Sequence, residues 1–538
     1  MLTVIALFAA AIAQDPGTPI APPPLPAIGS ETVVPTGLRV PRPTTRRCVV
    51  ELFAEREFQG EARVPIAYAP PPGCVGPWAK IVFEGDVRVT AGEQYDRTGA
   101  VTLAGVNLFT GTTMEPRKAL APAWHVERDV TDYAALFAQG QAGEAMLTNY
   151  VDARYTGRLF WSARLVFYPR PAGAAAPATP DLVMALTPAP VTIDAKTPEV
   201  AATVRFPRNL ERLAIDILAQ PQGDDEFWWS CSEAGEDGQP GCGAPFRDVE
   251  VSIDGTLAGI AAAYPWIYTG GVDPRMWSLT PGVEALDLPP TRLDLSPFAS
   301  LLNDGGPHRI ALRVVGAKRY FVATGTLLGW RDTGSAVVTG GLDINTLRAA
   351  VVTAKGSAGA KAGITTVAHR AGRLRGHVET SRGRVTTDIA YRLDFRNRQS
   401  GTEAAGRIDQ HSQVATLVEV RRPDGSTRRH LVESYPLHIA MDARKIGEDR
   451  VTDTHFRQGL TRTERREAGG RTTIRTTELL VEPRVHLVIP PSGRRDAKGQ
   501  ATTVTTTRVQ DSAAGCYDRS VTMTDNRVVA VRDGCPAR

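Results

Sequence analysis

Alternation of apolar with polar or small residues is the feature that most constrains what this chain can fold into. In residues 389–395, Ile-Ala-Tyr-Arg-Leu-Asp-Phe, an apolar side chain recurs at every second position, and residues 213–217 and 310–314 follow the same pattern. A period of two is typical of a half-buried β-strand. Long amphipathic helices are absent from the pattern, and short helical turns are expected only near Tyr133 and Ser296. The sequence therefore predicts an all-β protein.

A short pattern occurs twice and indicates a repeated β unit. Residues 129–137, DVTDYAALF, align with residues 294–302, DLSPFASLL, and strand-like segments flank both. A strand-rich unit of this length suits a jelly-roll sandwich, so we expect two tandem jelly-roll β-sandwiches packed side by side. Coincidence is the alternative explanation for so short a match. After residue 340 the chain becomes rich in Thr, Arg and Val, which predicts a C-terminal β-rich domain with a hairpin turn at residues 423–425.

The length of 538 residues exceeds what one core usually supports, so several domains are expected. The expected division is a signal peptide over 1–13, a Pro-rich linker over 14–45, a first jelly-roll domain over 46–170, a linker over 171–190, a second jelly-roll domain over 191–340 and a C-terminal β domain over 341–538.

The first residues predict export. Residues 1–13 are mostly apolar and end in Ala-Ile-Ala, which matches the small-x-small pattern read by signal peptidase, although the usual positively charged start is missing. A run of this length is too short to span a bilayer stably, so no membrane insertion is expected. We therefore expect a bacterial protein that is secreted or periplasmic.

The charge of the chain argues against nucleic acid as a partner. The chain has 62 Lys and Arg against 58 Asp and Glu, a formal net charge of +4, and its Arg residues are scattered along strand-like stretches. A nucleic-acid-binding domain would carry a clustered basic patch. We therefore expect no nucleic-acid partner.

Six cysteines in an exported chain form an even set that falls into three local pairs. The expected disulfides are Cys48 with Cys74, Cys231 with Cys242, and Cys516 with Cys535. A metal site is the alternative, but no CxxC motif supports it. The histidines after residue 340 do not fall at a ligand spacing either, so neither a metal nor another cofactor is expected.

Residues 223–230, Gly-Asp-Asp-Glu-Phe-Trp-Trp-Ser, place three carboxylates beside two tryptophans. Adjacent like charges repel and are costly to desolvate, and exposed indole surface is also unfavourable. Such a cluster favours a site that binds something polar through a flat apolar face, as carbohydrate requires. A calcium loop and a solvated turn are the alternatives, although the aromatic residues argue against both.

A second motif, Gly-Glu-Gln-Tyr-Asp-Arg at residues 92–97, precedes a predicted strand. The pair Asp96 and Arg97 would be a solvated ion pair at a strand end in the simplest interpretation. In the functional interpretation, Arg97 orients a substrate group while Asp96 has its pKa tuned for acid–base chemistry.

Together these motifs resemble the peptide-N4-(N-acetyl-β-glucosaminyl)asparagine amidase A family, the acid-active glycoamidases of plants and of some bacteria. The segments that carry the resemblance, in the family's order, are 92–97 (GEQYDR), 105–108 (GVNL), 128–131 (RDVT), 224–228 (DDEFW), 253–255 (IDG), 268–274 (YTGGVDP) and 306–308 (GPH). The resemblance is thinner after residue 340, and the segment 231–242 departs from the family pattern.

The resemblance implies an enzyme that hydrolyses the amide bond between an N-glycan and asparagine, releases the intact glycan and leaves aspartate. Its substrates would be N-glycosylated peptides and proteins, recognised at the chitobiose core, and we expect a monomer. The resemblance also implies two eight-stranded jelly rolls with an acidic cleft between them. Asp96 is then the expected principal catalytic carboxylate, Glu226 its partner across the cleft, and Glu115 a weaker candidate third acid. The expected substrate-binding residues are Arg97, Asp225, Trp228, Trp229 and Trp124.

Two carboxylates can supply the base and the acid that amide cleavage requires. If Asp96 and Glu226 face each other, repulsion raises one pKa, and acidic pH is expected to maintain the mixed protonation state. The alternatives are a glycan-binding protein without catalysis and, less favoured, a glycoside hydrolase that uses the same carboxylates.

Overall fold

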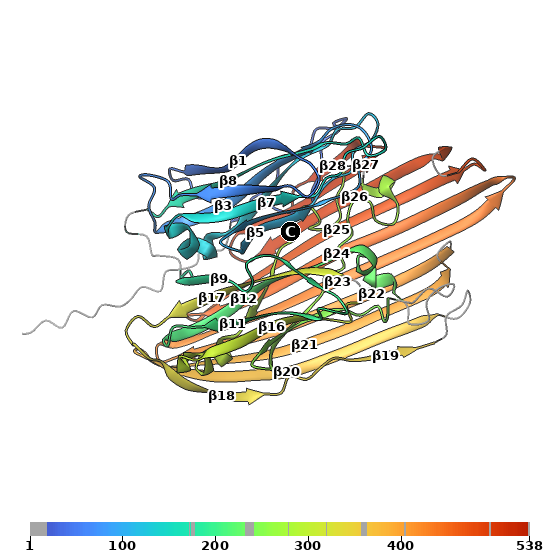
Figure 1. Cartoon of the computed structure of the whole chain (residues 1–538). Coiled ribbons are helices and arrows are strands. Elements are labelled where there is room, and N and C mark those ends of the chain that lie inside the picture. The colour runs from blue at the N-terminus through green and yellow to red at the C-terminus, as the bar shows by residue number, and fades with distance from the viewer. Residues whose placement is uncertain are drawn as a thin grey trace, which may run out of the picture.

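The structure, a computed structural model, consists almost entirely of β-strands (Figure 1). It describes residues 19–171, 173, 178–231, 242–277, 279–318, 320–356, 363–402, 405–493 and 496–535. Within these residues the only helices are short 3₁₀ helices, of which the longest has eight residues. The predicted all-β class is therefore confirmed. The predicted signal peptide over residues 1–13 lies outside the described residues.

The first eight strands form a β-sandwich of two four-stranded sheets. Their order is β1-β8-β3-β6 in one sheet and β2-β7-β4-β5 in the other. Phe83 and Trp161 of the first sheet share one buried cluster with Val101 and Leu108 of the second. The strands are β1 (Cys48–Phe58), β2 (Arg63–Tyr68), β3 (Trp78–Val89), β4 (Thr98–Leu103), β5 (Val106–Thr112), β6 (Ala123–Asp129), β7 (Gln141–Leu147) and β8 (Leu159–Pro169), with the 3₁₀ helix η1 (Thr131–Ala138) after β6.

The next strands repeat this arrangement in a second sandwich. The order is β10-β17-β12-β15 in one sheet, to which β9 adds beside β17, and β11-β16-β13-β14 in the other. The strands are β9 (Leu182–Ala185), β10 (Val191–Ile193), β11 (Glu199–Arg205), β12 (Leu210–Pro221), β13 (Asp248–Ile253), β14 (Thr256–Ala262), β15 (Thr291–Asp294), β16 (Pro307–Val315) and β17 (Phe321–Arg331).

Numbered from β1 and from β10, the two sandwiches have the same strand order, 1-8-3-6 facing 2-7-4-5. The helices η5 (Ser296–Phe298) and η6 (Leu301–Asp304) follow β15 just as η1 follows β6. The repeated sequence motif thus occupies the same position in both units. Because a period of two sets which face of a strand is buried, similar alternation in two stretches gives similar sheets.

The two sandwiches contact each other directly. Ala214 and Leu328 of the second sandwich belong to the buried cluster of the first. The Tyr133 hydroxyl donates a hydrogen bond to Asp216 (2.9 Å), and Gln220 Nε2 donates one to Thr98 Oγ1 (2.9 Å). These contacts fix the seam in which the candidate site lies.

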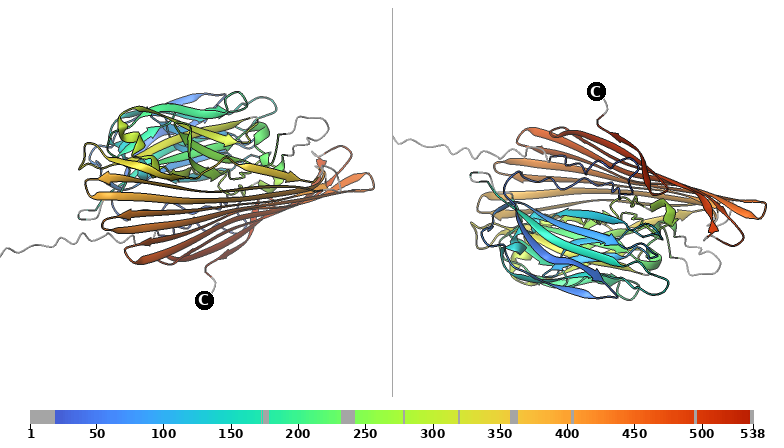
Figure 2. Two further views of the ribbon diagram at one scale, coloured as in Figure 1. Left: turned by 90° about the horizontal axis from the view of Figure 1, so that it is seen from below. Right: turned by 90° about the horizontal axis from the view of Figure 1, so that it is seen from above.

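The remaining strands form one eleven-stranded antiparallel sheet, whose face carries both sandwiches (Figure 2). Rings from the second sandwich pack on it, including Phe246 on Phe395 with centroids 5.1 Å apart and Trp277 on Phe456 at 5.4 Å. The expected turn at 423–425 joins two neighbouring strands. The strands are β18 (Thr339–Asn345), β19 (Val351–Lys355), β20 (Ile364–Thr380), β21 (Gly383–Thr402), β22 (Ala405–Arg422), β23 (Gly425–Ile446), β24 (Asp449–Ala468), β25 (Arg471–Ile489), β26 (Lys498–Asp511), β27 (Gly515–Thr524) and β28 (Arg527–Asp533).

The Pro-rich segment has no strand or helix in its described part, residues 19–45, but it is not a free linker. Arg519 Nη1 donates to the Pro23 carbonyl (2.7 Å), and Val34 packs in a cluster with Met523. Further along, the Val40 N–H donates to Glu127 (2.9 Å). The segment therefore ties the long sheet to the first sandwich.

All three expected disulfides are present, Cys48–Cys74, Cys231–Cys242 and Cys516–Cys535. The loop enclosed by the second of them, residues 232–241, lies outside the described residues. No helix in the part of the chain that the structure describes is long and apolar enough to cross a membrane.

Candidate active site

A cavity of about 1310 Å³ lies at the seam between the two sandwiches. Asp96 and Glu115 line it from the first sandwich, and Glu226, Gly270 and Asp273 line it from the second. The structure therefore brings the three expected acids into one site, although long stretches of chain separate them.

A buried glutamine holds the loop that carries Asp96, between β3 and β4. Gln94 Nε2 donates to Asn149 Oδ1 (2.8 Å), while its Oε1 accepts from the Tyr95 N–H (3.0 Å) and from Arg97 Nη2 (2.7 Å). The side chain thus bonds to residues on either side of Asp96. These bonds hold the loop that places Asp96 in the cavity lining.

Glu115 follows β5 and lies beside the Asp96 loop. The Arg97 N–H donates to Thr113 Oγ1 (2.8 Å), and the Thr113 N–H donates back to the Arg97 carbonyl (2.9 Å). Glu115 itself is buried, and Arg117 Nη1 donates to its Oε2 (3.2 Å). These bonds place two acids of the first sandwich side by side.

Gly270 of the second sandwich lies against both of these acids. A Cβ atom at this position would lie 2.6 Å from Glu115 Oε1 and 2.8 Å from Asp96 Oδ1. Its N–H donates to the Asp96 carboxylate. The neighbouring Thr269 hydroxyl donates to the Thr113 carbonyl (2.8 Å), so this loop is fastened to the first sandwich. Only glycine allows so close an approach.

Glu226 lies between the short helices η2 (Gly223–Asp225) and η3 (Trp228–Ser230) and is half-buried at the cavity wall. Burial raises its pKa to about 8, and the negative charges of Asp96 and Glu115 add to the rise. Burial likewise raises the pKa of Asp96 to about 7, with a contribution from Glu115. Burial also raises the pKa of Glu115, against the opposing effect of Arg117. Desolvation thus acts on all three acids, and like charge adds to it for Asp96 and Glu226.

Arg97, expected to bind substrate, lines the cavity. Its guanidinium carbon lies 5.9 Å from the Tyr95 ring centroid, and its Nη2 is held by Gln94 (2.7 Å). The side chain is therefore positioned at the cavity wall, as its expected role requires.

Asp225, expected to bind substrate, is not among the residues that line the cavity. Its side chain has 0% exposure and accepts hydrogen bonds from Arg247 Nη2 (2.7 Å), the Lys318 N–H (3.0 Å) and the Tyr320 N–H (2.9 Å). A buried carboxylate needs such partners to offset its desolvation. Asp225 instead fixes the backbone turn that presents Glu226.

The three tryptophans expected to contact sugar are also core residues. Trp228 is 0% exposed and Trp229 is 3% exposed, and both lie in the core shared by the second sandwich and the long sheet. The Trp229 carbonyl accepts a hydrogen bond from Asn397 of β21 (2.8 Å). Trp124 of β6 is 7% exposed and packs in the first sandwich. None of the three lines the cavity.

The aromatic residues that do line the cavity are Phe227, Tyr95, Tyr155, Tyr268 and Tyr320. Phe227 is 36% exposed and directly follows Glu226 in the acidic run, but it was not among the residues expected to bind substrate. The rings of Tyr95 and Tyr155 lie with centroids 5.0 Å apart. A search for aromatic residues next to the motif acids, as Tyr95 is to Asp96, would have found two of them.

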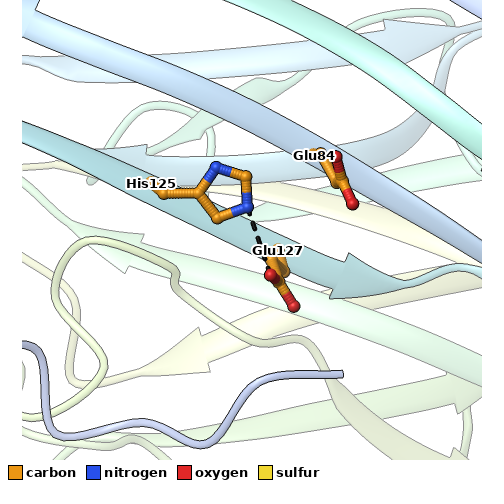
Figure 3. A group of neighbouring side chains, drawn as sticks. All are labelled: Glu84, His125 and Glu127. Atoms are coloured by element: carbon orange, nitrogen blue, oxygen red, sulfur yellow. Dashed lines mark hydrogen bonds and ion pairs between the residues drawn. The ribbon is translucent and has the colours of Figure 1, made fainter. Parts of the chain in front are cut away.

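One group of side chains has the spacing of metal ligands, Glu84, His125 and Glu127 on β3 and β6, away from the cavity (Figure 3). Arg42 Nη2 contacts Glu84 (2.7 Å) and Glu127 (2.9 Å), and Arg164 also contacts Glu84 (2.7 Å). Burial lowers the pKa of His125, but hydrogen bonds to Asp86 and Glu127 outweigh it and raise this pKa to about 9. Cationic side chains thus occupy the place of a metal, and the cluster fastens residues 40–42 to the first sandwich.

Comparisons with known proteins identify relatives of this chain. The model of a family described as "Peptide N-acetyl-beta-D-glucosaminyl asparaginase amidase A" matches residues 40–345. A Prunus dulcis protein named "Peptide-N4-(N-acetyl-beta-glucosaminyl)asparagine amidase A" is 28% identical over 375 residues, which are 64% of this chain. The match spans 65% of the length of that relative.

Two solved structures are also similar. PNGF-II matches with a TM-score of 0.36 and 12% identity over 53% of this chain and 66% of that chain. PNGase F, a glycosylasparaginase from Flavobacterium meningosepticum, matches with a TM-score of 0.36 and 11% identity over 54% of this chain and 97% of that chain.

The family match covers more than half of the chain and contains both sandwiches. Every residue that lines the cavity falls within it. This result confirms the resemblance that the sequence motifs carry. The chain therefore belongs to the peptide N-acetyl-β-D-glucosaminyl asparaginase amidase A family.

Proposed function

We propose that this protein is a glycoamidase that hydrolyses the amide bond between the first N-acetylglucosamine of an N-glycan and asparagine. The observation that carries the proposal is the convergence of Asp96, Glu115 and Glu226, from two sandwiches, on one cavity, each with a raised pKa. Membership of the family and the name of the almond relative support the same activity. The substrates are N-glycosylated peptides and proteins.

The chemistry follows from the two pKa values. Asp96, with a pKa of about 7, loses its proton before Glu226, with a pKa of about 8. The Asp96 carboxylate is then the base that takes a proton from water, whose oxygen bonds to the side-chain amide carbon. Glu226 gives its proton to the amide nitrogen as the carbon–nitrogen bond breaks. The products are an aspartate side chain and a glycosylamine that carries the whole glycan.

The remaining cavity residues position these two groups. The Gly270 N–H and the Gln94 side chain hold the Asp96 loop. Burial is the main cause of both raised pKa values, and the negative charge of Glu115 adds to each. Arg97 and the cavity aromatics Phe227 and Tyr320 provide polar and flat apolar surface for the sugar. We propose that the protein acts as a monomer, because a single chain supplies Asp96, Glu115 and Glu226.

We further propose that both sandwiches are jelly rolls, which their common strand order supports. We also propose the domain division expected from the sequence, 46–170, 191–340 and 341–538, with two adjustments: β9 at 182–185 pairs with β17 and so joins the second sandwich, and β18 of the long sheet begins at Thr339. Export to the periplasm or the medium is proposed from the apolar start of the chain, and the three disulfides support it, because disulfides persist in oxidising compartments.

Incubation of a defined N-glycopeptide with the protein at acidic and neutral pH, followed by mass spectrometry of peptide and glycan, tests the activity. Conversion of the glycosylated Asn to Asp with release of the whole glycan is expected. A cut between the two core sugars, which leaves one sugar on the peptide, would identify a glycoside hydrolase. Binding of the glycopeptide without any product would identify a glycan-binding protein.

A further inference from the structure

Gln220 carries a buried hydrogen-bond acceptor that has no partner among the described residues. The residue lies on β12, its side chain is 0% exposed, and it lines the cavity at the seam. Its Nε2 donates to Thr98 Oγ1 (2.9 Å), but its Oε1 accepts no hydrogen bond. Such an atom costs free energy unless another molecule supplies a donor.

This acceptor lies beside the catalytic acids. Thr98, which fixes the Gln220 side chain, is two residues beyond Asp96. The Gln220 amide also donates to the Tyr268 hydroxyl oxygen, while the Tyr268 hydroxyl donates to the Pro221 carbonyl (2.8 Å). Burial raises the pKa of Tyr268, and the charges of Glu226 and Asp96 add to the rise, which indicates that both acids are near. A ligand held by Gln220 would therefore be adjacent to the bond that the acids attack.

The surroundings of this acceptor are aliphatic. Leu218 lies two residues earlier on the same face of β12, and Val322 of β17 is the cross-strand neighbour of Gln220. Both residues line the cavity, together with Pro190. An acceptor flanked by aliphatic side chains matches a group in which an N–H lies next to a methyl group.

We propose that Gln220, Leu218 and Val322 form a subsite for the acetamido group of the first sugar, with Gln220 Oε1 accepting the acetamido N–H. The methyl group packs on Leu218 and Val322, and the bond completes the hydrogen bonding of Gln220. This inference rests on the proposed function, because it assigns the residues that select an N-acetylated sugar over a plain one. A site built around a buried acceptor discriminates strongly against a ligand that lacks the donor.

The nearly isosteric variant Gln220→Met tests the subsite, with Gln222→Met as its matched control. Gln222 Nε2 donates to the same Thr98 hydroxyl (3.0 Å), and Gln222 has no unpaired buried atom. The substrates are one glycopeptide series in which the sugar on asparagine is N-acetylglucosamine or 2-deoxyglucose. The readouts are kcat/KM for each sugar and the melting temperature of the free protein.

Gln220→Met is expected to lower kcat/KM for the N-acetylglucosamine peptide by about ten- to hundred-fold and to leave kcat/KM for the 2-deoxyglucose peptide nearly unchanged. The variant removes the unpaired Oε1 together with the Nε2 bond to Thr98, whose hydroxyl keeps its bond from Gln222, so its melting temperature should change little. Gln222→Met should keep the wild-type ratio between the two sugars. A wild-type ratio in Gln220→Met would overturn the inference, since water alone would then satisfy Oε1. A lower melting temperature with both substrates affected equally would also overturn it, in favour of a structural role.

If the protein is not a glycoamidase, the wild-type protein will convert neither glycopeptide, and the subsite can then be tested by binding alone. If the wild-type protein converts neither peptide, binding of N-acetylglucosamine and of 2-deoxyglucose to wild type and Gln220→Met is measured by calorimetry. A preference for the N-acetylated sugar that Gln220→Met abolishes supports the subsite without the hydrolysis. Equal binding of both sugars by the wild-type protein rejects the subsite as well.

Discussion

Asp96 and Glu226 belong to different sandwiches and line one cavity, where burial together with the charge of Asp96 raises the pKa of Glu226 to about 8. The electrostatic coupling between them shows that the two acids share one environment. Repulsion between them was expected from the sequence to raise one pKa. Burial raises the pKa of Glu115 as well, so three carboxyl groups have pKa values above their ordinary range.

The pH dependence of kcat/KM should reflect this coupling. Below about pH 7 Asp96 is protonated and cannot act as base, and above about pH 8 Glu226 is ionised and cannot act as acid. We expect a bell-shaped profile with its maximum between these values, which lies above the acidic range suggested by the sequence motifs. Initial rates on a glycopeptide from pH 4 to pH 10 give the profile. Glu115→Gln should move the acidic limb to lower pH, and an acidic limb near pH 4 in wild type would contradict the account.

Stability should change with pH in the direction set by Asp96. Its pKa is about 7 in the folded protein against an ordinary value of 3.8, so the folded state holds a proton that the unfolded state has lost between these pH values. The contribution of Asp96 to the free energy of unfolding is therefore most favourable below about pH 4, and it is lost as the pH rises towards 7. Asp96→Asn removes this loss and should raise the free energy of unfolding by about 1–4 kcal/mol at pH 8 and by little at pH 4. Urea unfolding at both pH values measures the difference; equal effects at both would refute it.

Gly270→Ala should disable the site without unfolding the protein. The new Cβ would lie within 2.8 Å of carboxylate oxygens of Glu115 and Asp96 and would push them apart. A displacement of this size should lower kcat by about 100-fold. Gly37→Ala is the control, because a Cβ at Gly37 meets nothing within 4 Å. A Gly270→Ala variant with wild-type kcat would show that the spacing of these acids does not matter.

Asp225 should matter for stability and not for contact with substrate. Asp225→Asn leaves the buried Arg247 guanidinium without a counter-charge, which should cost about 3–5 kcal/mol of unfolding free energy. The exposed ion pair of Asp181 with Arg331 provides a matched control, and Asp181→Asn should cost less than about 1 kcal/mol. Chemical denaturation of both variants gives the comparison. If both variants lost less than about 1 kcal/mol of unfolding free energy, the buried pair of Asp225 with Arg247 would not be what holds the turn that precedes Glu226.

Much of the fold could be predicted because strand burial has a strict period. In β2 buried and exposed residues alternate at every position, so local sequence alone indicates the strand and its inner face. The repeated motif indicated two similar units for another reason, because it forms the short 3₁₀ helices that follow β6 in one sandwich and β15 in the other. The attachment of residues 19–45 could not be predicted, since it depends on a few long-range bonds such as that of Arg519 to Pro23.

The acids of the site could be predicted from motifs, but the roles of their neighbours could not. Residues 223–230 form short 3₁₀ turns, in which successive side chains point about 120° apart, so Asp225 and Glu226 face opposite environments. The same rotation buries Trp228 and leaves Phe227 at the cavity. Gly270 and Gln220 acquire their roles only when the two sandwiches meet, and no local pattern marks that contact.

Hydrolysis in water enriched in ¹⁸O shows which bond of the glycopeptide is cleaved. Wild-type protein and Asp96→Asn are incubated with one N-glycopeptide, and peptide and glycan are analysed by mass spectrometry. Wild type is expected to yield an aspartate carrying one ¹⁸O atom at the former glycosylation site and an intact glycan released as its glycosylamine. Asp96→Asn should bind the glycopeptide with similar affinity and turn it over at least about 100-fold more slowly. A glycan cleaved within its core, or a full rate in Asp96→Asn, would contradict the account.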